Sequence, residues 1–188
     1  SFSLFTYYSD ELSFTKEEMP AYLDKARDCL KEGKNLTEAE AILNAILNQS
    51  PNASGILGFL STLHVQKGHI SLAEHLAKLA LENEKNEKNK AAILNNLGVI
   101  YKQYRFDTDK AKPLFEQAVK INGDDPEHLI NYASVFLAEG NPKKCLELMD
   151  KALKNNKENI CGHWNRALAL LEIGDYEQGF NEYHYGID

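Results

Sequence analysis

The sequence predicts an all-α protein, a solenoid built from repeated pairs of antiparallel helices. Small residues recur at intervals of 34 or 35 residues over most of the chain, and Gly98, Ala133 and Ala167 form one such series. Each interval also holds two segments in which apolar residues have helical spacing. One helix pair cannot bury its own apolar face, so successive pairs are expected to stack on one another.

Composition excludes several classes of protein. The formal net charge of −7 argues against a sequence-independent nucleic-acid binder, which needs a basic surface. No apolar run approaches the roughly 20 residues that span a bilayer, and the first residues do not resemble a signal peptide. Three widely spaced cysteines, Cys29, Cys145 and Cys161, favour reduced, buried thiols. We therefore predict a cytoplasmic protein with no nucleic-acid or membrane partner.

Residues 1–19 precede the repeats and are rich in aromatic side chains. They are interpreted as a cap over the first repeat, or as an arm that inserts into another copy and gives a homo-oligomer. The segment from Thr15 to Glu18 has the pattern of a capping box, but Pro20 fits that start poorly, and the alternative is a first helix that begins at Pro20 itself. The aromatic residues concerned are Phe2, Phe5, Tyr7, Tyr8 and Phe14.

About five repeats are expected, at residues 20–53, 54–87, 91–125, 126–159 and 160–188. In the third, the first helix has apolar or small residues at i, i+3, i+4 and i+7, and the second has them at Ala111, Phe115 and Ala118. Two irregularities stand out. The run "ENEKNEKNK" is expected to form a longer loop between repeats, or else to extend the preceding helix. One extra residue is expected in the turn near "RFDTD".

The third repeat, "LNNLGVIY…AKPLFEQAVKI", resembles the tetratricopeptide repeat, whose 34-residue unit has Leu-Gly and Tyr in its first helix and two alanines in its second. The other four segments share its phase with more substitutions. This resemblance implies a right-handed superhelix with a concave groove that binds an extended peptide or a partner protein.

Asparagine recurs at one position of three successive first helices. Asn96 is expected to point away from the packed stripe of its helix, and Asn131 and Asn165 are its equivalents. An amide can both donate to and accept from a peptide backbone, so the three side chains are candidates for binding a peptide. They resemble the asparagine ladder of O-linked N-acetylglucosamine transferases. The alternative is an exposed position where asparagine is harmless, as we expect for Asn95.

The same phase gives further candidates for the groove. Phe59 and Asp24 occupy the asparagine position in the first two repeats, so a ladder would begin only at the third. Trp164, the sole tryptophan, could anchor a partner or cap the last core. The peptide-binding candidates are therefore Asn96, Asn131, Asn165, Phe59, Gln66, Gln103, Ser134 and Trp164.

The sequence shows no constellation that would support catalysis, a cofactor or a metal site. His64 and His69 are the closest histidine pair, but a spacing of five would place them on different faces of a continuous helix. We therefore predict a non-catalytic module that binds a protein or peptide. The alternative function is an arm of a larger glycosyltransferase, because "GDYEQGFNEYHY" is similar to the last repeat of bacterial tetratricopeptide proteins of that type. Self-association through the N-terminal segment or the terminal repeats is a third hypothesis.

Overall fold

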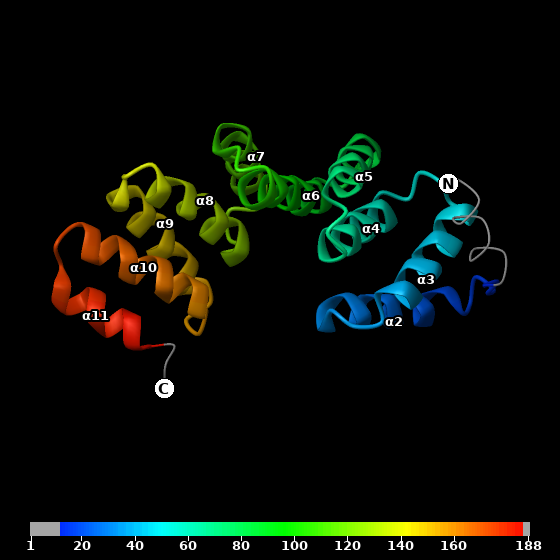
Figure 1. Ribbon diagram of the computed structural model, residues 1–188, viewed down its shortest axis with the longest axis horizontal. Helices are drawn as coiled ribbons and strands as arrows, with labels where there is room; N and C mark the ends of the chain where they lie inside the picture. Colours follow the sequence, from blue (N-terminus) through cyan, green and yellow to red (C-terminus); the bar gives the residue numbers. More distant parts are fainter. Residues whose placement is uncertain (1–11, 186–188) are drawn as a thin grey trace. The chain divides into compact units, whose positions relative to one another are not determined.

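The computed structural model describes residues 12–185, which form ten α-helices, one π-helical segment and no strand (Figure 1). The predicted all-α class is confirmed, and successive helices are joined by short turns into antiparallel hairpins. The chain divides after Asn89 into two compact units, and each is described by itself.

The first unit contains two hairpins. The first hairpin pairs α2 (Met19–Glu32) with α3 (Leu36–Gln49), and the second pairs α4 (Ser54–Gln66) with α5 (Ile70–Asn83). Their inward faces form one core of mainly small and aliphatic side chains. Its fully buried members include Ala26, Ala39, Ile42, Leu43 and Leu63.

The residues before α2 close one end of this core. Phe14 is buried, and its ring stacks on that of Tyr22 with the ring centroids 4.8 Å apart. The reciprocal hydrogen bonds of the predicted capping box are present, since the Thr15 amide donates to Glu18 Oε2 and the Glu18 amide donates to Thr15 Oγ1. They close the turn that precedes α2, whose own N-cap residue is Glu18. Pro20 lies in the first turn of α2, also as predicted. Phe2, Phe5, Tyr7 and Tyr8, on which the arm hypothesis depends, lie outside the described residues.

The second unit contains three hairpins. α6 (Glu87–Val99) continues into the π-helical segment η1 (Ile100–Tyr104) and pairs with α7 (Thr108–Ile121). α8 (Pro126–Ala138) pairs with α9 (Pro142–Asn155), and α10 (Ile160–Glu172) pairs with α11 (Tyr176–His184). Each helix from α7 to α11 begins after a residue whose side chain accepts from a backbone amide of the first turn. These capping residues are Asp107, Asp125, Asn141, Asn159 and Asp175.

The turn inside each hairpin contains a residue with a positive φ angle. In four hairpins this residue is glycine, which adopts such angles without a steric penalty. In the α6–α7 hairpin the equivalent residue is Phe106, with φ of 55°. The phenylalanine side chain is 86% exposed, so no buried contact compensates for the backbone strain. The four glycines are Gly33, Gly68, Gly140 and Gly174.

The π-helical segment accounts for the extra residue of the third repeat. From Gly98 to Phe106 the chain has one residue more than from Ala133 to Gly140. The prediction that this residue lies in the turn is wrong, because the chain widens within the helix itself, at Ile100–Tyr104. Because the helix widens there, Gly98 still packs on Phe115 and the turn still has its positive-φ residue directly before the N-cap of α7.

We expect Phe106→Gly to stabilise the second unit by about 0.5–1 kcal/mol, because relief of the left-handed strain exceeds the entropy that glycine adds to the unfolded chain. Urea unfolding followed by the fluorescence of Trp164, the sole tryptophan, would measure the change. Phe106→Ala is the control, since alanine has the same unfavourable φ and should give no gain. Equal stabilities for the two variants would show that the turn is not strained.

The charged run between the units is shorter as a loop than expected. α5 ends at Asn83 and α6 begins at Glu87, so only three residues are non-helical. Glu84 fixes this turn by accepting from the amides of Lys85 and Asn86 and from the Ser54 hydroxyl. Both alternatives stated for this run are therefore wrong, because most of the surplus extends the helix that follows.

Cys29 and Cys145 are buried, as expected, but Cys161 in the first turn of α10 is exposed.

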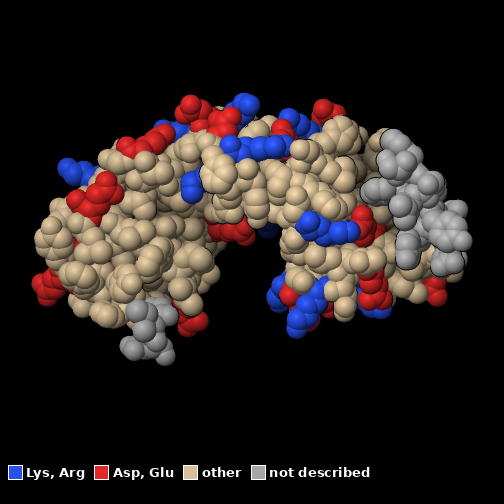
Figure 2. All heavy atoms as spheres, in the orientation of Figure 1, with Lys and Arg blue, Asp and Glu red and all other residues tan. Residues whose placement is uncertain are grey.

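On the surface, lysines and acidic residues are interspersed, and the view of the second unit in Figure 2 shows few charges over the middle of α8, α9 and α10. Among residues 12–185, none of the helices combines the length and the apolar composition that crossing a bilayer requires.

Candidate peptide-binding surface

The three repeated asparagines belong to the second unit and lie on its three first helices. Asn96 on α6 is exposed, whereas Asn131 on α8 and Asn165 on α10 are half-buried. Each lies two residues before a buried small residue, so the predicted phase relation holds in the folded chain. Neither Asn96 nor Asn165 has a side-chain hydrogen bond within residues 12–185. We call Asn96, Asn131 and Asn165 the asparagine series.

Asn95, expected to be an ordinary surface residue, is instead 2% exposed. Its Oδ1 accepts from Asn131 Nδ2 at 3.0 Å, and its own Nδ2 donates to Glu127 Oε1 at 3.3 Å. The prediction was wrong because the first helix of one hairpin is covered by the first helix of the next, which a single helix does not reveal. We call the hydrogen bonds that run from Asn131 through Asn95 to Glu127 the Asn95 relay. The relay orients the Asn131 amide, so a buried neighbour holds one member of the asparagine series.

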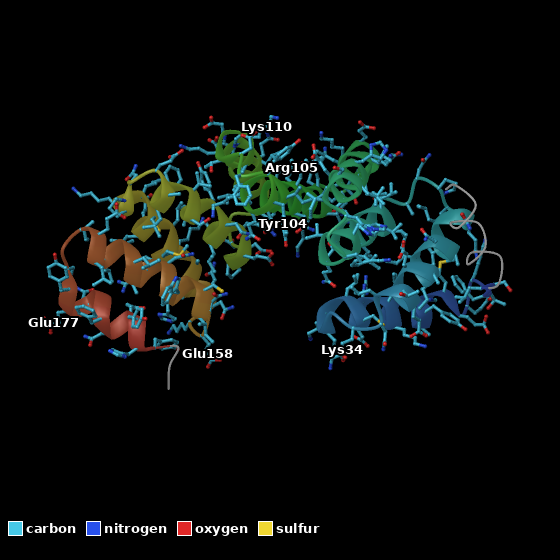
Figure 3. The ribbon with its side chains drawn as sticks, viewed as in Figure 1. Lys34, Tyr104, Arg105, Lys110, Glu158 and Glu177 are labelled. Atoms are coloured by element: carbon cyan, nitrogen blue, oxygen red, sulfur yellow. The ribbon has the colours of Figure 1, made fainter. Side chains whose placement is uncertain are left out.

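Three other predicted residues lie in the same unit. Ser134 is half-buried, and its Oγ donates to the Asn131 carbonyl oxygen at 2.7 Å. Gln103 is exposed on the π-helical segment, next to Tyr104 and Arg105, which Figure 3 labels. Trp164 is 46% exposed.

Trp164 is positioned by the last hairpin. Its ring lies against Tyr183 of α11, with the centroids 5.1 Å apart. α11 is fixed to α10 by Glu182, which accepts from Arg166 at 2.7 Å and pairs with His163. The residues that occupy the position of Trp164 in the two preceding first helices, Asn95 and Ile130, are buried. Trp164 is therefore an accessible aromatic side chain at a position that is otherwise covered.

The two predicted residues of the first unit have different surroundings. Phe59 is half-buried, and the guanidinium of Arg27 lies 5.3 Å from its ring centroid while also pairing with Asp24. Gln66 Nε2 donates to the Leu30 carbonyl oxygen at 2.9 Å, so one of its two amide hydrogens is already used between α4 and α2. This unit has an aromatic and a charged group where the second has amides.

The described part of the chain holds no activated thiol at Cys145 and no cluster of three or more metal-ligating side chains. Burial raises the pKa of Cys145 to about 11, so its thiol is protonated at neutral pH. Within residues 12–185 no group of three or more histidine, cysteine or acidic side chains is placed to hold a metal ion.

The expectation that His64 and His69 lie on different helix faces is wrong, because the helix ends between them. Their Nδ1 atoms are 3.2 Å apart, because the turn at Gly68 reverses the chain between the two histidines. The sequence spacing alone does not show where this turn lies.

Comparison with known proteins agrees with this architecture. Residues 105–171 match the family model described as "Tetratricopeptide repeat". The solved structure of Pseudomonas aeruginosa PilF superposes with a TM-score of 0.75 and 22% identity, covering 90% of this chain and 75% of that one. The fold is that of tetratricopeptide repeat proteins.

Two further similarities are to proteins of different lengths. The chain is 30% identical over 111 residues to the BBSome complex member BBS4 of Bos taurus, which is 58% of this chain and 21% of the relative. The chain thus spans about a fifth of that relative's length. YrrB, described as a tetratricopeptide protein with an unusual peptide-binding site, superposes with a TM-score of 0.63 and 18% identity, covering 98% of this chain and 91% of YrrB. Together these matches indicate the tetratricopeptide repeat fold.

Proposed function

We propose that this chain binds an extended peptide segment of a partner protein through the first-helix surface of its second unit. The observation that carries the proposal is the asparagine series, which gives three successive first helices an amide at the same position. Asn96 and Asn165 have no hydrogen-bonding partner within the described chain, so their donors and acceptors are available to a ligand. An extended backbone presents N–H and C=O groups that such amides can pair with, independently of its side chains.

The Asn95 relay supports the same function. Asn131 uses one amide hydrogen toward Asn95, which fixes the plane of its side chain and leaves its Oδ1 in a defined orientation. An amide held in this way loses less conformational entropy on binding than a free one. Trp164 adds an exposed aromatic surface on the third of these helices, where a bulky or apolar side chain of the peptide would pack.

Selection from a peptide array, followed by titration of one labelled binder, would test the proposal. In the double variant Asn96→Ala, Asn165→Ala, we expect affinity to fall by about 5–150-fold, because each lost hydrogen bond contributes about 0.5–1.5 kcal/mol. Neither substitution removes a hydrogen bond within residues 12–185, so the variant should keep its fold, which circular dichroism would check.

The matched control removes two exposed amides from second helices, Gln117→Ala and Asn181→Ala. It should bind as tightly as the unaltered chain. A second arm uses the same peptide with alternate backbone amides N-methylated, which should bind weakly if the backbone is recognised. Binding that survives both the asparagine substitutions and the N-methylation would overturn the proposal.

A further inference from the structure

Two histidines meet in the first unit where α4 turns into α5. His64 lies in the last turn of α4 and is 2% exposed, whereas His69 is the exposed N-cap residue of α5. Gly68, with φ of 79°, reverses the chain between them. As a result the two Nδ1 atoms face each other at 3.2 Å.

The tautomer of His64 follows from its other neighbour. Glu40 of α3 places Oε1 3.5 Å from His64 Nε2, and its second oxygen pairs with Lys67. A carboxylate favours a proton on the nitrogen that faces it, so Nε2 of His64 carries the hydrogen. The Nδ1 lone pair of His64 is then directed at His69, which donates its own Nδ1 hydrogen.

We propose that His64 and His69 form a two-histidine binding site for a divalent transition metal such as Zn²⁺, with the two Nδ1 atoms as ligands. Imidazole nitrogens bind Zn²⁺ at 2.0–2.1 Å, which puts two of them about 3.3 Å apart at a tetrahedral angle. The observed separation is close to this value. Glu40 supplies the outer carboxylate that typically orients a metal-binding histidine through its second nitrogen.

Binding requires only local change. The ring centroids are 5.4 Å apart and the ring planes are 29° from parallel, so the exposed His69 ring has to turn while the buried His64 ring stays in place. The hydrogen of His69 moves from Nδ1 to its solvent-exposed Nε2, which leaves both Nδ1 lone pairs for the metal and releases no net proton. The remaining coordination positions are left to water or to a donor from a partner.

The charged and titratable groups that act on His64 are Glu40, Lys67 and His69. Burial lowers the pKa of His64, Glu40 opposes this shift, and His69 and Lys67 add to it. The net lowering keeps the His64 ring neutral at physiological pH, as a metal ligand must be. Zn²⁺ binding should accordingly weaken once the pH falls far enough to protonate the His64 ring.

Isothermal titration of the full chain with Zn²⁺, free of any histidine tag and carrying Cys161→Ser to remove the exposed thiol, would test the site. We expect one equivalent to bind. His69→Ala should abolish this binding, and Glu40→Gln should weaken it by about 10–100-fold. His75→Ala is the matched control, because His75 is an exposed histidine on the same helix, α5, and should leave binding unchanged.

Nitrogen-detected NMR of the imidazole rings gives a second measurement that does not depend on affinity. Zn²⁺ should shift the Nδ1 resonances of His64 and His69 together and leave those of His75 in place. If the chain binds no Zn²⁺, or if His69→Ala leaves the stoichiometry unchanged, the two histidines form only a hydrogen bond with each other and the proposal is wrong.

Discussion

Gly98→Ala should destabilise the second unit by about 1–3 kcal/mol, although alanine is the better helix former. A Cβ atom at Gly98 would lie 2.6 Å from Cε1 of Phe115 and 2.8 Å from its Cδ1. Phe115 is 1% exposed, so its ring is enclosed by other side chains and can yield only by displacing them. Urea unfolding followed by Trp164 fluorescence would measure the loss.

Gly58 of α4 provides the matched control for Gly98. A Cβ atom there has no other atom within 4 Å, so Gly58→Ala should stabilise the first unit by about 0.5–1 kcal/mol. The double variant Gly98→Ala, Phe115→Leu should be more stable than the sum of the two single effects, because the smaller side chain relieves the overlap. A Gly98→Ala variant as stable as the unaltered chain would contradict the close helix approach.

Asn95→Asp should cost about 3 kcal/mol or more at neutral pH, while Asn96→Asp should change stability by no more than about 0.5 kcal/mol. The first substitution keeps the shape of the side chain but places a charge in a buried site, facing Glu127 across 3.3 Å. The second adds the same charge one residue away on an exposed position. Both variants change helix propensity and net charge equally, so the difference between their unfolding free energies reports the effect of burial.

The cost of Asn95→Asp should also depend on pH. Burial and Glu127 both raise the pKa of the introduced carboxyl above its value in the unfolded chain. The unfolded state therefore loses its proton first as pH rises, and the deficit grows with pH until the carboxyl is ionised in both states. Unfolding midpoints measured between pH 4 and 8 should diverge from those of the unaltered chain. A deficit that is independent of pH would contradict the buried relay.

The repeat itself could be predicted because it leaves a periodic signal. Gly98, Ala133 and Ala167 must be small wherever helices approach closely, so their spacing alone indicates hairpins and their phase. The capping pattern at Thr15 and Glu18 could be predicted for a similar reason, since its partners are three residues apart and need no tertiary contact.

Features that depend on the neighbouring hairpin could not be predicted in this way. Asn95 and Asn96 are adjacent and chemically identical, and only the packing of α8 on α6 makes one buried and the other exposed. The approach of His69 to His64 depends on where α4 ends. The extra residue of the third repeat was predicted in the turn, but it lies in the π-helical segment at the end of the helix. The spacing of small residues is the same in both cases, so the sequence does not distinguish a longer turn from a π-helical segment.

The Asn95 relay also bears on the order of modules in the array. Its buried oxygen requires a donor from the first helix of the hairpin that follows, and Asn131 supplies it. The equivalent link between the next two hairpins is apolar, because Ile130 stands where Asn95 does. A hairpin without an amide at the position of Asn131 would leave a buried acceptor unpaired if it followed α6–α7. The α6–α7 and α8–α9 hairpins are therefore specific for each other. Exchanging a repeat between them would lower the stability of the array, whereas the same exchange between α8–α9 and α10–α11 would leave no buried acceptor unpaired.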